Sequence, residues 1–329
     1  MSAGPLSPPP EEDEMGHIDG SHHATLCVGA AQEDVDFHTG LLGLRFIKKT
    51  VLYDGSLPIY HLYYSNADGD ASSVVTTFPF LQAGVIGRRG TNQARELQLA
   101  VPAGSLDFWS RRLAGRSVDV DDVEVLGRRR LLFHHPCGIE YALVGVDGDT
   151  RTGFAGDDVP PEHAVHGIYG VGVHVANPEN MVEFVDQSFY GKLVAEEGDR
   201  VTLSVGRPSG GGSIELVVNR RDDPGTWRFG AGTIHHFAWD VASYENQDEV
   251  KFQIEGVGYT DISELKDRTY FKSVYVRTPA GALFELAVTT PDGWATDESP
   301  NELGSAFKVP PQFEAQREEI FAQLEHIEV

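Results

Sequence analysis

Two pairs of adjacent histidines and one isolated glutamate are the side chains of this sequence that could do chemistry. His22-His23 and His235-His236 each open a run of β-branched, aromatic and other apolar residues, which is typical of the start of a strand. Glu285 lies in the otherwise apolar segment 282–288. Burying a carboxylate without a compensating charge is unfavourable, so a metal ion or another cation is its usual partner. Two imidazoles and one carboxylate form the ligand set that holds non-haem Fe(II) with open positions, so the three segments predict a metal site.

Strand geometry limits which histidine of each pair can face a shared site. Successive side chains of a strand point to opposite faces, so adjacent histidines cannot both face one cavity unless the strand contains a bulge. The alternation places Thr25 on the same face as His23. His22 and His235 are then candidates for supporting a ligand histidine, provided that a bulge turns them inward. The alternative for each pair is a buried histidine that hydrogen-bonds to the backbone.

One structural unit is repeated four times along the chain, with a period of roughly 70 residues. Each unit begins with a lead strand, continues into a helical pattern that contains an aromatic residue, and closes on a strand after short alternating segments. The sequence therefore predicts an α+β fold built from four βαβββ modules. The lead strands are expected at 22–28, 95–101, 169–175 and 235–241. The closing strands are expected at 74–78, 139–144, 213–218 and 283–288.

Aligning the four units shows which of them carry the candidate ligands. Glu285 belongs to the fourth unit, and the corresponding residues of the second and third units are Ala142 and Glu215. The second position of the lead strand is, in order, His23, Glu96, Gly170 and His236. We therefore expect one metal site, formed by the first and fourth units, and a second cup in which the two glutamates are a relic or a solvated pair. Six other histidines do not match the ligand position and are expected not to bind the metal: His61, His134, His135, His163, His166 and His174.

Two domains are expected, because 329 residues are many for one hydrophobic core. Residues 1–17 combine proline with acidic side chains and should be disordered or only loosely docked. A Gly- and Pro-rich segment after the second unit marks the domain boundary. The predicted division is an N-terminal domain at 18–155, a C-terminal domain at 156–292, and a tail at 293–329 with a helix from about 314 to 325.

The chain is strongly acidic, with a formal charge of −24 from 26 basic and 50 acidic side chains. Such a surface repels nucleic acids and anionic membranes. It indicates either a halophilic protein, in which high salt screens the repulsion, or a merely acidic one. No apolar run is long enough to span a bilayer and no secretion signal is recognised, so we expect a cytoplasmic protein. The two cysteines, Cys27 and Cys137, are too few for a disulfide framework.

In these segments the chain resembles the vicinal oxygen chelate superfamily and, within it, the ring-cleaving dioxygenases that act on hydroquinones. The resemblance spans nearly the whole chain after its acidic N-terminal arm. It differs from the usual catechol-cleaving pattern, in which both ligand histidines come from the C-terminal half, because the third unit has Gly170 at that position. The segments that carry the resemblance are His22-His23-x-Thr25, 43–50, 60–63, 76–79, 232–236, Asp267-Arg268-x-Tyr270-Phe271 and Phe284-Glu285.

The resemblance implies an Fe(II) ion held by His23, His236 and Glu285, with Mn(II) as a further candidate metal. The implied fold is two domains of βαβββ modules whose curved mixed sheets form a metal-holding cup. The implied reaction inserts both atoms of O₂ into a hydroquinone-type aromatic substrate and opens the ring next to a hydroxyl group. Assembly into a homo-oligomer stays open. The resemblance also implies catalytic roles beside the metal for His22, Thr25, His235, Arg268 and Tyr275.

Three other functions stay open. A catechol extradiol dioxygenase would use the same metal triad. A glyoxalase-type lyase or isomerase normally needs four protein ligands, and this chain supplies three. A metal-free small-molecule-binding protein of the same fold would not need two histidine pairs and a glutamate. Among the single residues, Arg268 could instead form an ion pair with Asp261 or Glu264, and Tyr275 could serve only strand packing.

Overall fold

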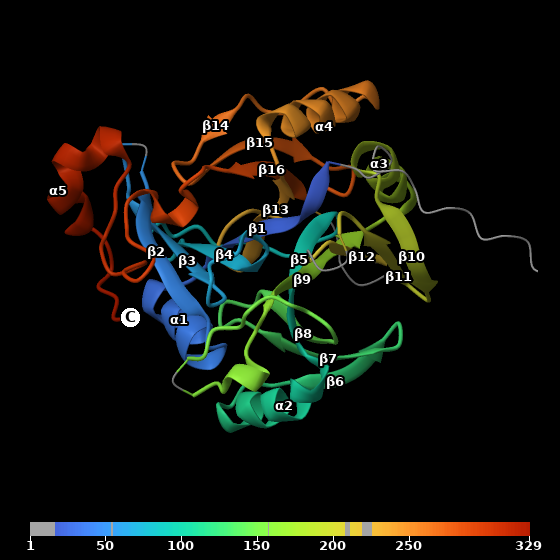
Figure 1. Cartoon of the computed structure of the whole chain (residues 1–329), viewed down its shortest axis with the longest axis horizontal. Coiled ribbons are helices and arrows are strands. Elements are labelled where there is room, and N and C mark those ends of the chain that lie inside the picture. The colour runs from blue at the N-terminus through green and yellow to red at the C-terminus, as the bar shows by residue number, and fades with distance from the viewer. Residues whose placement is uncertain (1–16, 54, 157, 208–210, 219–225) are drawn as a thin grey trace, which may run out of the picture.

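Two eight-stranded sheets form the framework of the molecule (Figure 1). The computed structural model describes residues 17–53, 55–156, 158–207, 211–218 and 226–329. The first sheet has the order β14-β15-β16-β13-β1-β4-β3-β2, and the second has the order β10-β11-β12-β9-β5-β8-β7-β6. The strands of the first sheet are β1 (Ile18–Val28), β2 (Arg45–Leu52), β3 (Ile59–Ser65), β4 (Val74–Pro79), β13 (Thr233–Val241), β14 (Lys266–Asp267), β15 (Phe271–Arg277) and β16 (Leu283–Thr289). Those of the second are β5 (Gln93–Pro102), β6 (Asp121–Val125), β7 (Arg128–His134), β8 (Glu140–Val146), β9 (Gly167–Val175), β10 (Lys192–Glu197), β11 (Arg200–Ser204) and β12 (Ser213–Val218).

Each lead strand is followed by a helix and then by three further strands. The predicted α+β fold of four βαβββ modules, with curved mixed sheets, is therefore confirmed. The first helix is short and passes directly into a π-helix, a wider turn of the kind often found near functional sites. The helices of the four modules are α1 (Ala31–Val35) with the π-helix η2 (Asp36–Leu41), α2 (Leu106–Gly115), α3 (Glu179–Phe189) and α4 (Tyr244–Gly256).

The sheets combine modules that are distant in sequence. In the first sheet β1 pairs antiparallel with β13, which joins the first module to the fourth. In the second sheet β5 pairs antiparallel with β9, which joins the second module to the third. Each sheet therefore takes one module from 18–155 and one from 156–292. This pairing brings the two histidine pairs onto neighbouring central strands.

The lead strands lie at the centre of the sheets, and most of their side chains are buried on both faces. Such strands contain nearly continuous apolar segments, because neither face is exposed to water. Large aromatic residues such as Trp109, Trp239 and Phe284 are completely buried beside them. The polar side chains that remain in these central strands are therefore the exceptions that require explanation.

The C-terminal tail packs against the first sheet, next to β2 (Figure 1). Its expected long helix is shorter in the structure, where a 3₁₀ helix η7 (Pro311–Gln316) leads into α5 (Arg317–Phe321). Lys48 on β2 is fully buried, with Nζ 2.7 Å from Asp297 Oδ1 and 2.6 Å from Glu298 Oε2. The 3₁₀ helix η6 (Gly293–Thr296) carries Trp294, whose ring centroid lies 6.2 Å from that of His22. The tail therefore reaches the neighbourhood of the first histidine pair.

Three short 3₁₀ helices complete the connections, namely η3 (Ala71–Ser73), η4 (Ala103–Ser105) and η5 (Pro161–His163). Of the arm expected at 1–17, residues 1–16 lie outside the described residues. Within the part of the chain that the structure describes, no helix has both the length and the apolar character needed to cross a membrane.

Candidate metal centre

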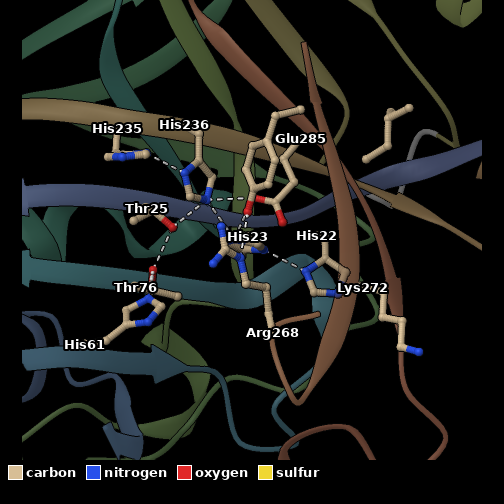
Figure 2. A network of polar contacts seen from close by, with 12 residues as sticks. His22, His23, Thr25, His61, Thr76, His235, His236, Arg268, Lys272 and Glu285 are labelled. Atoms are coloured by element: carbon tan, nitrogen blue, oxygen red, sulfur yellow. Dashed lines mark hydrogen bonds and ion pairs between the residues drawn. The ribbon is translucent and has the colours of Figure 1, made fainter. Parts of the chain in front are cut away.

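The structure brings His23, His236 and Glu285 together on one face of the first sheet (Figure 2). They lie on β1, β13 and β16, which are neighbouring strands. In the strand register Ala238 faces both His23 and Glu285, and His236 lies two residues before it. Residues two apart on a strand share a face, so all three side chains point to the same side. Three residues distant in sequence therefore converge at one point.

The potential ligand atoms of these three residues are close to one another. His236 Nε2 lies 3.0 Å from His23 Nε2 and 2.8 Å from Glu285 Oε2. His23 Nε2 lies 3.5 Å from Glu285 Oε2, and at most 6% of any of the three residues is exposed. Metal–ligand bonds of about 2.1 Å at right angles place neighbouring ligand atoms about 3 Å apart. The spacing is therefore suitable for a shared divalent cation.

A bulge at each histidine pair turns one ring toward the other. We call the candidate ligands His23 and His236 the inner histidines, and His22 and His235 the outer histidines. The register between β1 and β13 shifts at both pairs, so His22 and His235 are extra residues in the ladder. His22 Nδ1 lies 2.8 Å from His23 Nδ1, and His235 Nδ1 lies 2.7 Å from His236 Nδ1. When each inner Nδ1–H donates to its outer neighbour, the inner Nε2 keeps a lone pair for a metal. On its other side, His22 Nε2 lies 2.9 Å from Thr289 Oγ1.

Burial keeps all four imidazoles of the two pairs neutral. It lowers the pKa of His236 to about 3, with the nearby Arg268 charge as the second cause. Burial also lowers the pKa of His22 to about 4 and the pKa of His235 to about 3. The pKa of His23 is lowered well below its usual value for the same reason. Neutral imidazole is the form that binds metals, so the pairs are ready for a cation near pH 7.

Glu285 provides the test of whether these residues fit a metal ion. Its side chain is fully buried, and within the described residues neither carboxylate oxygen makes a hydrogen bond. The equivalent Glu215 of the second sheet is also buried, but Arg130 Nη1 lies 2.7 Å from it and Arg200 also pairs with it. A buried carboxylate needs such compensation. The residues around Glu285 therefore fit a divalent cation, and the set of two imidazoles and one carboxylate leaves positions open.

The second cup is the corresponding region of the second sheet, and it contains a glutamate and a glycine where the first has imidazoles. The residue equivalent to His23 is Glu96, whose pKa burial raises to about 7 and whose carboxylate accepts a hydrogen bond from Gln98 Nε2 at 2.8 Å. The residue equivalent to His236 is Gly170. At the three equivalent positions of the second sheet, all described, there is no imidazole. The second cup therefore differs from the first in the side chains at its three equivalent positions.

A second group of potential ligands, Asp34, His38 and His135, is buried where α1 and η2 meet the end of β7. Asp34 Oδ2 accepts hydrogen bonds from Tyr64 and Thr77. Asp34 Oδ1 lies 3.1 Å from His38 Nδ1 and 3.3 Å from His135 Nε2, and His38 Nδ1 is also 3.0 Å from the Asp34 carbonyl. The sequence predicts no ligand role for His135 and does not single out the Asp34–His38 spacing of four residues on a helix. The carboxylate here already has donors, which distinguishes this group from Glu285.

Thr25, Tyr275 and Arg268 also approach the triad. Thr25 Oγ1 lies 2.8 Å from His236 Nε2. Tyr275 is the cross-strand neighbour of Glu285, and burial followed by the Glu285 charge raises the pKa of its phenol, which is therefore protonated near pH 7. Arg268 Nε lies 3.2 Å from the Tyr275 hydroxyl. The alternative ion pairs of Arg268 considered from the sequence are not formed among the described residues.

Three polar side chains near the site were not singled out as functional by the sequence: His61, Tyr63 and Thr76. His61 Nε2 lies 3.0 Å from Thr76 Oγ1, and Thr76 Oγ1 lies 2.7 Å from Thr25 Oγ1. The Tyr63 hydroxyl lies 3.0 Å from His61 Nδ1. The signal that could have identified them is the alternation of polar and apolar residues on β3 and the threonine pair on β4, on the strands beside β1.

Comparisons with known proteins show similarity over nearly the whole chain. No protein-family model matches it. The sequence is 39% identical over 310 residues to the chlorohydroquinone/hydroquinone 1,2-dioxygenase of Sphingobium indicum, which covers 93% of this chain and 96% of the relative. The crystal structure of a candidate dioxygenase from Bacillus subtilis subsp. subtilis strain 168 has a TM-score of 0.88 and 31% identity, covering 95% of this chain and 99% of that one. Glyoxalase I from Zea mays, with a TM-score of 0.57 and 13% identity over 82% of this chain and 92% of that one, shares the fold alone.

Proposed function

The chain belongs to the hydroquinone-type ring-cleaving dioxygenases of the vicinal oxygen chelate superfamily, and we propose that it is an Fe(II)-dependent enzyme that opens hydroquinone-type rings next to a hydroxyl group. The observation that carries the proposal is Glu285, a buried carboxylate without a hydrogen bond among the described residues, beside two neutral imidazoles. The substrate class is supported by the full-length relative that is named for hydroquinone and chlorohydroquinone.

His23, His236 and Glu285 would hold the metal, and the remaining positions would be open to substrate and O₂. When bound, Fe(II) supplies a redox-active cation that can bind a phenolate oxygen and O₂ side by side. His22 and His235 hold the inner histidines in the tautomer that directs Nε2 toward the cation. The two histidine pairs therefore orient one candidate ligand each, one pair on β1 and the other on β13.

The residues around the triad bind and orient an aromatic substrate. The Phe271 ring lies 4.9 Å from His23 and 5.1 Å from His22, centroid to centroid, so an apolar surface borders the ligands and excludes water. Arg268 contributes a positive charge that stabilises anionic oxygens. Tyr275 is protonated near pH 7 and is placed to donate a proton. His235 is neutral and accepts from His236 at Nδ1, so its Nε2–H is a hydrogen-bond donor toward a substrate oxygen.

Oxygen uptake by Fe(II)-loaded protein tests this function. Hydroquinone, methylhydroquinone, chlorohydroquinone and catechol are each supplied, and the product is analysed after reaction with isotopically labelled O₂. We expect uptake with the hydroquinones and a ring-opened product that contains both labelled atoms. Mn(II)-loaded protein shows whether Fe(II) is required. Uptake with catechol alone would identify a catechol dioxygenase. Glutathione-dependent conversion of methylglyoxal with Zn(II) or Ni(II) would identify a lyase, and protein that retains no metal would favour a binding function.

A further inference from the structure

A continuous line of polar side chains runs away from the candidate metal centre across the first sheet. It begins at Thr25 on β1, continues through Thr76 on β4 to His61 on β3, and ends at Tyr63 on the same strand (Figure 2 shows the first three). The successive distances are 2.7, 3.0 and 3.0 Å. At its inner end, Thr25 Oγ1 lies 2.8 Å from His236 Nε2, one of the three candidate ligand atoms.

The fold itself does not require this line. Thr25 faces Thr76 in the register of β1 and β4, and Tyr63 faces Thr76 in the register of β3 and β4. In the second sheet Gln98 and Leu132 both lie opposite Ala142. Gln98, Ala142 and Leu132 are therefore the equivalents of Thr25, Thr76 and Tyr63, respectively. At these positions, all described, the second cup has no hydroxyl equivalent to Thr76 or Tyr63, so it lacks such a line.

The end of the line determines the direction of its hydrogen bonds. Tyr63 is 2% exposed, and among the described residues its hydroxyl has no hydrogen-bond partner except His61 Nδ1. Burial raises the pKa of Tyr63, so the hydroxyl keeps its proton and donates it to His61 Nδ1. The opposite direction would leave a buried O–H without an acceptor, which is unfavourable.

The remaining hydrogen bonds follow from this first one. Burial lowers the pKa of His61, so its ring carries a single proton, which must lie on Nε2 because Nδ1 accepts from Tyr63. His61 Nε2–H then donates to Thr76, and Thr76 donates to Thr25. The proton of the Thr25 hydroxyl is left to point away from the line, toward the ligand atoms.

We propose that Tyr63, His61 and Thr76 are positioning residues that hold Thr25 as a hydrogen-bond donor to an anionic substrate oxygen in the open part of the metal site. The proposal rests on the proposed function, because it takes a phenol-type substrate as the acceptor. The line gives Thr25 a fixed direction before the substrate arrives, and a donor that is already oriented binds an oxyanion more strongly than one that must reorient.

Two neighbouring threonines on β4 provide matched variants. Thr76 and Thr77 are both fully buried, but Thr76 belongs to the line, whereas Thr77 donates to Asp34 on the opposite face. We expect Thr76→Val to retain the metal and to weaken anaerobic hydroquinone binding on the order of ten-fold, the effect of one hydrogen bond to a charged oxygen. Thr76→Ser should restore the affinity, and Thr77→Val should leave it unchanged. Equal affinity for wild type and Thr76→Val, or equal loss in Thr77→Val, would overturn the proposal.

The tautomer of His61 tests the line without any activity. Nitrogen chemical shifts of isotopically labelled histidine, assigned with the variant His61→Gln, should show the proton on Nε2 near neutral pH. Tyr63→Phe should remove that preference. A proton on Nδ1 in the wild type would overturn the proposed direction. If the wild type neither binds hydroquinone nor consumes O₂ with it, the proposed function fails, and this measurement still decides whether the line exists.

Discussion

Glu285 and Glu215 occupy equivalent positions in the two sheets, but within the described part of the chain only Glu215 is paired with arginine side chains. Both carboxylates are buried, and their environments differ in what compensates the negative charge. Arg130 and Arg200 form ion pairs with Glu215 in the second cup. Among the described residues no lysine or arginine forms an ion pair with Glu285, which lies beside neutral imidazoles, with the charge of Arg268 farther away. The repeat therefore contains its own control for the metal site.

This difference predicts that replacing each glutamate by glutamine has a different effect on the stability of the metal-free protein at the two positions. Glu285→Gln removes a buried charge that has no lysine or arginine ion-pair partner among the described residues, so the melting temperature of the metal-free protein should rise or stay unchanged. Glu215→Gln leaves two arginines without their partner, so stability should fall by about 3–5 kcal/mol. Denaturant unfolding of the two variants measures this. Destabilisation of both to the same degree would show that Glu285 is compensated within the metal-free chain.

The outer histidines should control metal affinity. His22→Ala and His235→Ala each remove the partner of a ligand Nδ1, so the inner imidazole loses its fixed tautomer and orientation. We expect Fe(II) affinity to fall about 10- to 100-fold in each variant, which is typical for loss of such a partner. Competition with a chelator measures the affinity. Unchanged affinity in both variants would contradict the assigned role of the bulges.

Tyr275→Phe should separate metal binding from turnover. The substitution keeps the ring on β15 and removes only the hydroxyl that contacts Arg268. Metal content should stay at the wild-type level, and kcat should fall about 10²- to 10⁴-fold if the hydroxyl supplies a proton. Metal analysis measures the metal content, and steady-state kinetics with hydroquinone measures kcat. A variant with wild-type kcat would assign Tyr275 to strand packing.

Stability of the metal-free protein should decrease in acid because of the buried histidines. Folding lowers the pKa of His235 and His236 from 6.5 to about 3, so between these values the unfolded chain binds more protons than the folded one. The free energy of unfolding therefore rises with pH across this window. The stability that depends on these two neutral histidines decreases as the pH falls below 6.5. Each group contributes up to about 1.4 kcal/mol per pH unit. Unfolding titrations between pH 4 and pH 7 measure the slope, which His236→Asn should reduce; an unchanged slope would show that His236 is protonated in the folded state.

The repeat made much of the architecture predictable. Four similar units could be recognised because each lead strand is apolar and each helix carries an aromatic residue. The pairing of the first module with the fourth is set by contacts between β1 and β13, which are far apart in sequence. Local patterns contain no information about such contacts. The shortened tail helix has a similar origin, because the tail follows contacts with β2 such as the pairing of Phe307 with Lys49.

The convergence of His23, His236 and Glu285 was predictable from the sequence, and the surroundings of these residues were less so. His23, His236 and Glu285 could be found because polar residues in apolar strands are unusual. The contacts of His61 could not be predicted, because they depend on β4 lying between β3 and β1. The compensation of Glu215 by Arg130 was hidden for the same reason, since the arginine lies on β7 and the glutamate on β12.

The central claim is that His23, His236 and Glu285 close around one catalytic Fe(II). Anaerobic titration of metal-free protein with Fe(II), followed by oxygen uptake with hydroquinone at each step, tests it most directly. The wild type and a control variant of the exposed His134, His134→Ala, should bind one Fe(II) per chain, with uptake rising in proportion to occupancy. His23→Ala and Glu285→Gln should lose both. Retention of tight, stoichiometric Fe(II) by His23→Ala and Glu285→Gln, or oxygen uptake that does not depend on iron, would contradict the account.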